Sequence, residues 1–180
     1  EKVIRLANTD TLTKQFVKDK EVFADAFNYF LHDGKNVIKP EELKVADTTE
    51  VIVPYGEDGT GLKIQPVQKI RDVFYSVMTE ENKVYMLCGI ENQAEPHNAM
   101  PVRTALYDIM EYVAQIQEAA KAHREVKNRG KGNDFLSGFH ATDRLIPVYT
   151  LVVYWGSGEW DAPRSLFEML DVQDERELYG

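Results

Sequence analysis

Residues 72–93 constrain the fold of this chain more than any other segment. Two runs of residues that favour β-strands flank a polar tetrapeptide, and this pattern predicts a β-hairpin. If the loop is symmetric, Thr79 faces Val84, and each step away from the loop pairs one further residue from each strand. The predicted register therefore places Asp72 directly opposite Glu91.

This register brings two carboxylates together. Opposed residues in an antiparallel pair have Cβ atoms about 5 Å apart, and like charges at that separation destabilise a sheet. Because side chains alternate between faces with period two, Gln93 lies on the same face as Glu91. The pair of acids indicates either a metal site or an end of the sheet that meets water, and the residue types alone leave both interpretations open.

Apart from the acids, both faces of the predicted hairpin are mostly apolar, which is typical of strands in the middle of a covered sheet. The face of the acids is expected to carry Phe74, Met78, Tyr85 and Leu87, and the opposite face Val73, Val77, Met86, Cys88 and Ile90.

The rest of the chain alternates between helical and extended patterns. In order, we expect a helix from Asp19 to Asp33-Gly34, a strand at 48–53, the hairpin, a long helix with Pro101 in its first turn, a buried strand at 146–155 and a short helix at 163–170. This order predicts an α/β fold in which helices flank a mixed central β-sheet.

Hydrophobic spacing also predicts which helix faces are buried. For the first helix the expected stripe is Val22, Phe23, Ala26, Phe27, Phe30 and Leu31, and for the long helix it is Val102, Ala105, Leu106, Ile109, Val113, Ile116 and Ala120. Asp25 is expected to face water.

Length and composition favour one globular domain over residues 1–180, with residues 1–18 as a loosely packed lead-in. The chain begins without methionine, so we expect it to be a piece of a longer one. No apolar run is long enough to span a membrane, and the single cysteine excludes a disulfide framework, so we expect a cytoplasmic protein. The net charge of −9 is unusual for a protein that binds nucleic acid.

Several polar residues outside the hairpin are candidates for the same site. Arg103 and Tyr107 are one helical turn apart and could face a ligand together, although an ordinary exposed pair would have the same spacing. Lys69 and Arg71, with Gln68, come just before Asp72 and could supply positive charge near the acids, and Glu50 on the preceding strand is a candidate third acid.

The motifs taken together resemble a known family. Arg-Asp72-Val-Phe is followed by Gly-Ile-Glu91-Asn-Gln93, by Ala-Met-Pro-Val-Arg103 leading to Tyr107, and by a hydrophobic strand ending in Tyr-Trp-Gly156. In order and spacing, over about residues 20–170, they resemble the Rpn family of recombination-promoting nucleases, which are also labelled transposases. That family belongs to the PD-(D/E)xK superfamily, whose fold is restriction-endonuclease-like.

The resemblance implies a metal-dependent DNA endonuclease in which Asp72 and Glu91 hold Mg²⁺ or Mn²⁺ and the backbone carbonyl of Asn92 is a further ligand. Such an ion polarises the phosphate that is cleaved. Gln93 occupies the position at which most of the superfamily has lysine, and its uncharged amide could orient water or phosphate. Lys69, Arg103 and Tyr107 are then expected to contact the DNA backbone, and a homodimer would allow both strands to be cut.

Two other functions stay open. The net charge of −9 and Gln93 favour a decayed nuclease fold that binds DNA or protein without cutting, whereas the preserved acids oppose it. A metal-dependent enzyme acting on a small phosphorylated substrate would need a closed polar pocket, which the sequence does not indicate.

Overall fold

The computed structural model describes residues 11–46, 49–52, 67–128 and 130–171, and for residues 49–52 and 67–70 it describes the backbone alone. The strands are β1 (Leu43–Val45), β2 (Thr49–Ile52), β3 (Val67–Ile70), β4 (Val73–Met78), β5 (Val84–Gln93) and β6 (Val148–Tyr154). The helices are α2 (Lys20–His32), α3 (Met100–Glu125) and α4 (Asn133–Ser137), with 3₁₀ turns η1 (Pro40–Glu42) and η2 (Phe167–Met169).

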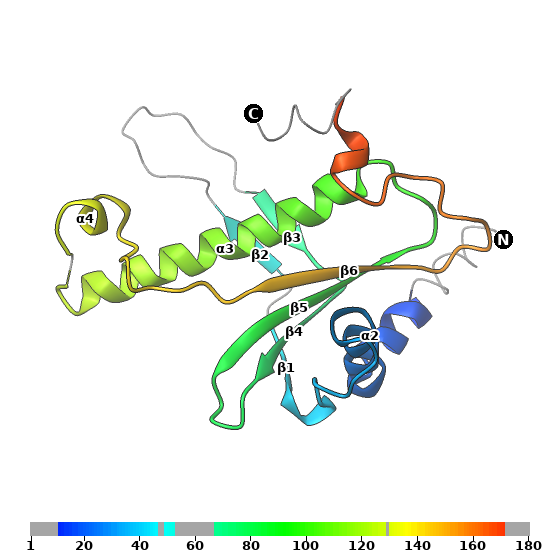
Figure 1. Cartoon of the computed structure of the whole chain (residues 1–180), viewed down its shortest axis with the longest axis horizontal. Coiled ribbons are helices and arrows are strands. Elements are labelled where there is room, and N and C mark those ends of the chain that lie inside the picture. Colours follow the sequence, from blue (N-terminus) through cyan, green and yellow to red (C-terminus); the bar gives the residue numbers. More distant parts are fainter. Residues whose placement is uncertain (1–10, 47–48, 53–66, 129, 172–180) are drawn as a thin grey trace.

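A four-stranded mixed sheet lies at the centre, in the order β1-β4-β5-β6 (Figure 1). The β1–β4 and β4–β5 pairs are antiparallel, whereas β5 and β6 are parallel and are connected through α3. Helix α3 lies on one face of this sheet and α2 on the other (Figure 1). The expected α/β fold with a mixed central sheet between helices is confirmed.

The hairpin register is as predicted over most of its length, because Val73 pairs with Ile90 and Val77 pairs with Met86. A β-bulge then shifts the register, and Met78 rather than Thr79 pairs with Val84. The extra residue, Tyr85, therefore packs against the α2 side of the sheet, and its predicted place on the face of the acids is wrong.

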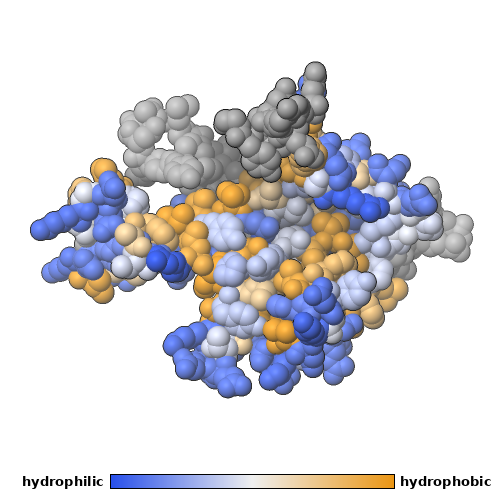
Figure 2. Space-filling model, in the orientation of Figure 1, coloured by the Kyte–Doolittle hydropathy of each residue, from blue (hydrophilic) through white to orange (hydrophobic). Residues whose placement is uncertain are grey.

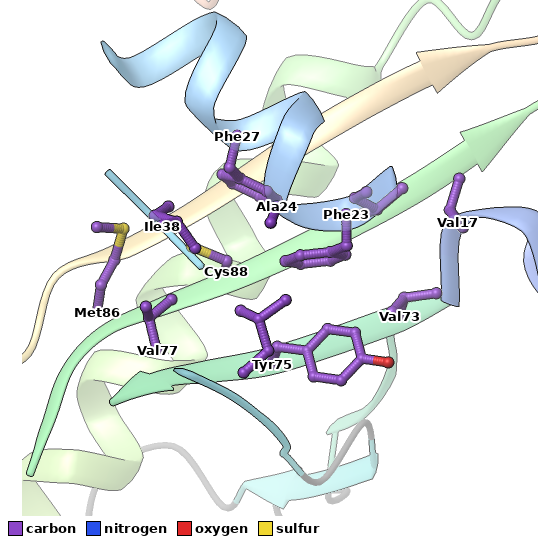
Figure 3. Close-up of a cluster of buried hydrophobic side chains, with 12 residues drawn as sticks. Val17, Phe23, Ala24, Phe27, Ile38, Val73, Tyr75, Val77, Met86 and Cys88 are labelled. Atoms are coloured by element: carbon purple, nitrogen blue, oxygen red, sulfur yellow. The ribbon is translucent and has the colours of Figure 1, made fainter. Parts of the chain in front are cut away.

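Helix α2 covers one face of the sheet. As predicted, the helix begins after Asp19, whose side chain accepts hydrogen bonds from two amides of the first turn, and it ends at Asp33 in the left-handed conformation. Phe23 and Phe27 are completely buried against β4 and β5 (Figure 3). Asp25 is exposed, as expected, but so is Phe30, because the buried stripe runs through Ala24 and Asn28 instead.

Helix α3 covers the other face, and of the predicted stripe only the last residue, Ala120, is buried. Val102, Leu106 and Ile109 are about half exposed, whereas Met110 and Glu111 are buried. Polar contacts explain the rotation of the helix. Asp108 bonds to Thr150 in β6 and to Arg71, which precedes β4, and three further hydrogen bonds of Tyr112 and Gln115 follow the same side. The Tyr112 hydroxyl, for example, accepts from the Val148 amide at 3.1 Å.

Tyr112 also packs against a small apolar cluster on this face, which comprises Phe74, Leu87 and Val148. The face of the acids is therefore the face covered by α3, and the α2 face carries the larger cluster.

The remaining segments differ in part from the sequence-based expectations. Residues 11–18 are helical rather than a loose lead-in: most are exposed, but Val17 is buried in the core. The strand predicted at 48–53 is β2, and it pairs with β3 in a separate two-stranded sheet that contacts α3. The last predicted helix is only the 3₁₀ turn η2.

Candidate functional site

Asp72 and Glu91 come together at one end of the hairpin. Asp72 immediately precedes the first β4 residue, Val73, which pairs with Ile90, so the ladder leads directly to the opposition of the two acids that was predicted. The negative charge of Asp72 raises the pKa of Glu91, and the main-chain amide beside Glu91 donates to Asp72.

Glu91 is a buried acid whose charge and hydrogen-bonding capacity are only partly satisfied by its neighbours. Its side chain is 2% exposed, and its Oε2 atom lies 3.4 Å from Arg103 Nη2. Its other oxygen, Oε1, is buried and has no hydrogen-bond donor among the described residues. Burial first, and then the charge of Asp72, raise the pKa of Glu91 from its usual 4.5 to about 7, although Arg103, Arg71 and Lys14 act in the opposite direction.

Asp72 is held by two different groups. Its Oδ2 atom accepts a 2.8 Å hydrogen bond from the Asn92 amide, and its Oδ1 atom lies 3.1 Å from Lys14 Nζ. The Asn92 side chain in turn accepts a 2.7 Å bond from the indole nitrogen of Trp155. These contacts fix the carboxylate at the end of the sheet while 18% of the Asp72 side chain stays exposed.

Arg103 and Tyr107 act as a pair, as their spacing on the helix predicted. Arg103 Nε donates to the Tyr107 hydroxyl at 2.8 Å, and the guanidinium lies 5.5 Å from the centroid of the same ring. The first turns of α3 thereby carry the cation that faces Glu91. The Arg103 side chain is 37% exposed, so it is accessible to an anion from solvent.

Gln93 follows Glu91 by two positions in β5 and is half-buried. Its main-chain carbonyl accepts from the Trp155 amide, and within the described part of the chain its side-chain amide makes no hydrogen bond. The amide is therefore available to a ligand near the acids.

Two candidate residues cannot be placed at the site. Glu50 and Lys69 pair with each other in the β2–β3 ladder, and their side chains lie outside the described residues. Their expected roles, as a third acid and a phosphate contact, stay predictions.

Arg71, one of the residues expected to supply positive charge near the acids, is the largest fully buried side chain of the chain segments described. Arg71 Nη2 lies 3.0 Å from Asp108 Oδ1, and its guanidinium lies 4.3 Å from the centre of the Phe74 ring. A Cβ atom at Gly89 would lie 2.7 Å from Arg71 Nη1, so a side chain there would have to displace this buried guanidinium. The sequence signal for the burial of Arg71 was the glycine of the Gly-Ile-Glu91 motif, which is Gly89.

Lys14 is a residue of the site that the sequence analysis missed. It lies in the helical segment 11–18, where Phe16 makes an edge-on contact with Trp155 at 5.9 Å and the Lys18 carbonyl accepts from the Tyr75 hydroxyl at 2.7 Å. These contacts dock the segment beside Asp72. No periodicity links residues 14 and 72, so the sequence offered no signal for this contact.

The donor set fits a hard divalent cation. Asp72 at the start of β4 meets Glu91 of β5, and one Glu91 oxygen has no donor among the described residues. The mutual repulsion of the acids would be relieved by a positive ion. Among the residues that the structure describes, no group of three or more His, Cys, Asp or Glu side chains could hold a metal. Mg²⁺ is commonly held by one or two carboxylates together with waters and phosphate oxygens, so two acids suffice.

The mixed sheet between helices, with its paired acids at one end, defines an α/β protein of the restriction-endonuclease-like class. The chain belongs to the family described as "Putative transposase, YhgA-like", whose model matches residues 63–179. The match includes Asp72, Glu91, Arg103 and Tyr107. No curated protein and no solved structure matches the chain. Within the described residues, no helix is long and apolar enough to cross a membrane.

Proposed function

We propose that this protein is a divalent-metal-dependent DNA endonuclease of the transposase-associated kind. The observation that carries the proposal is the meeting of Asp72 with Glu91, whose Oε1 atom is buried and has no donor among the residues that the structure describes. A fold gains nothing in stability from such an arrangement, since an unsatisfied buried acceptor costs about 1–3 kcal/mol. Family membership supports DNA as the partner.

In this proposal Asp72 and Glu91 hold Mg²⁺ or Mn²⁺. A residue in a strand directs its amide and its carbonyl to the same neighbouring strand, and the Asn92 amide points to Asp72. The Asn92 carbonyl is therefore directed to the same side and is the candidate third ligand. When bound, the ion supplies Lewis acidity to a phosphate oxygen.

The remaining groups orient the substrate. Arg103 lies beside Glu91 with part of its guanidinium exposed, and the Tyr107 hydroxyl fixes its direction, so this cation can bind a phosphate oxygen next to the acids. Gln93 carries both a donor and an acceptor in its amide and can hold the attacking water or a phosphate oxygen. Lys69 is the candidate for a further phosphate contact.

One observation favours a second candidate function, a decayed nuclease that binds DNA or protein without cutting. Each acid already has a cation of the protein close by, since Lys14 pairs with Asp72 and Arg103 pairs with Glu91. These cations partly replace the charge that a metal would bring, and Gln93 adds no positive charge. Metal binding at the acids distinguishes the two functions.

Cleavage of supercoiled plasmid in Mg²⁺ or Mn²⁺ tests the proposal. We expect the wild type to nick the plasmid and EDTA to abolish this activity. Asp72→Asn and Glu91→Gln should each be inactive, whereas Glu95→Gln should nick as the wild type does. Glu95 is an exposed acid four residues after Glu91 and is the matched control. Cleavage that survives both substitutions would place the site elsewhere, and the absence of both cleavage and Mn²⁺ binding would favour the decayed nuclease.

A further inference from the structure

A cavity of about 570 Å³ opens beside the acids, within the 300–1,000 Å³ range of small-ligand pockets. It is bounded by the outer edge of β6, the first turns of α3, one aromatic residue of α2 and the segment that follows β6. Figure 2 views this side of the molecule, where hydrophobic side chains gather over β6 between α3 and α2.

Strand register places this cavity next to the acids. In the parallel β5–β6 ladder Glu91 pairs with Val152 and Gln93 pairs with Tyr154, and both partners line the cavity. Paired residues share a face of the sheet, and neighbouring strands are about 4.8 Å apart. Thr104, which also lines the cavity, directly follows Arg103. A DNA strand whose phosphate lies at Glu91 and Arg103 would therefore have an adjacent base within reach of the cavity.

The lining has the chemistry of a nucleobase site. Tyr154 and Trp160 form an edge-to-face pair with ring centroids 5.3 Å apart, and Phe30, which is 66% exposed, adds a third aromatic ring. Among the lining residues that the structure describes, Arg164 is the only charged one and none is a carboxylate, although the chain carries a net charge of −9. Aromatic rings with a nearby cation are what proteins use to bind unpaired bases and their phosphates.

Gly156 sets the position of the Tyr154 ring. A Cβ atom at residue 156 would overlap the hydroxyl and ring carbons of Tyr154, so the side chain folds back over the glycine. The Tyr-Trp-Gly156 ending of the strand, noticed in the sequence as a family motif, thus shapes one wall of the cavity.

We propose that this cavity binds one unpaired nucleobase of the DNA strand adjacent to the phosphate held at the acids. The proposal rests on the proposed nuclease function and gives it a substrate class, because a base within a duplex is stacked and cannot reach the rings. The protein should therefore prefer single-stranded DNA, or duplex DNA with an unpaired base at the cleavage position.

Fluorescence anisotropy with a labelled thymidine 12-mer in Ca²⁺ tests the cavity. We expect Tyr154→Leu and Trp160→Leu each to weaken binding about tenfold, in line with the loss of one stacked base. The same two substitutions should change the affinity for a fully paired duplex by less than twofold. Tyr149→Leu is the matched control, because Tyr149 lies on β6 but does not line the cavity, and it should bind as the wild type does. Circular dichroism checks that each variant is folded.

A second measurement does not depend on altering the cavity. The chain has two tryptophans, and Trp155 is kept because its indole bonds Asn92 at the acids. Stacking of a base on Trp160 should quench the emission of the wild type during titration with the 12-mer. Unchanged emission, or unchanged affinity of Tyr154→Leu and Trp160→Leu, would overturn the proposal. If the protein binds the base but does not nick plasmid, the proposed nuclease function is wrong and the base site is supported. If the protein nicks plasmid and the cavity variants have no effect on binding, the base site is wrong and the nuclease function is supported.

Discussion

The carboxyl group of Glu91 is buried beside a second acid, so its protonation is coupled to folding. Its pKa is about 7 in the folded protein against a usual 4.5, and the folded state therefore binds more protons than the unfolded state between these values. Stability from this group is fully present below pH 4.5 and is lost as the pH rises through 7. The shift corresponds to about 3 kcal/mol.

Urea unfolding at pH 5 and pH 8 checks this coupling. We expect Glu91→Gln to be more stable than the wild type at pH 8, and the wild type to regain up to about 3 kcal/mol relative to this variant at pH 5. Mg²⁺ at pH 8 should stabilise the wild type and not the variant, because the ion binds the ionised acid. A difference between the two proteins that does not vary with pH would contradict the buried environment of Glu91.

A second residue-scale prediction concerns Gly89. Gly89→Ala would push the Arg71 guanidinium away from Asp108, and a buried charge without its partner is strongly destabilising. We expect a loss of about 3 kcal/mol in the free energy of unfolding. Gly158→Ala is the control, because a Cβ atom there meets nothing closer than 4.0 Å. Equal thermal midpoints for the two variants would show that the space beside Arg71 is larger than the structure indicates.

At the scale of elements, the sequence predicted the hairpin well and the long helix poorly. Strand period alone gave the faces near the acids, whereas the predicted opposition of Asp72 and Glu91 holds because two local departures cancel: Met78 rather than Thr79 pairs with Val84, and the bulge returns the register at Val77 and Met86. The face of α3 is decided instead by contacts with distant residues, such as the bond from Thr150 Oγ1 to Asp108 at 2.7 Å. Hydrophobic spacing contains no information about such polar pairs, so in the first turns of α3 it selected the exposed side, and Lys14 was missed for the same reason.

Because of the observed rotation of α3, we expect substitutions on its two sides to differ in their effect on stability. Leu106→Gln together with Ile109→Gln should change the free energy of unfolding by no more than about 0.5 kcal/mol per site, since both side chains are about half exposed. Met110→Ala, on the buried side of the same helix, should cost about 2–5 kcal/mol. Urea titrations of the two proteins check the comparison, and the reverse order would restore the face that the hydrophobic pattern predicted.

At the scale of the whole molecule, the folding unit extends beyond the family match. The site lies within residues 63–179, but half of the twelve buried residues of the α2-side cluster precede residue 63. Phe23 and Phe27 are among them, and they cover the hairpin strands on which Asp72 and Glu91 depend (Figure 3). The acids are therefore held in place by segments that the match does not include.

A fragment of residues 63–180 should consequently fail to fold. Each large apolar side chain contributes about 1.5–3 kcal/mol by burial, whereas a whole domain is stable by only about 5–15 kcal/mol, so losing the cover of one sheet face exceeds what the fold can tolerate. We expect the fragment to bind a hydrophobic dye, to lack near-ultraviolet circular dichroism and to unfold without a cooperative transition, whereas the full chain unfolds cooperatively. A fragment that unfolds cooperatively and binds Mn²⁺ as the full chain does would show that the sheet and α3 form the acidic site without α2.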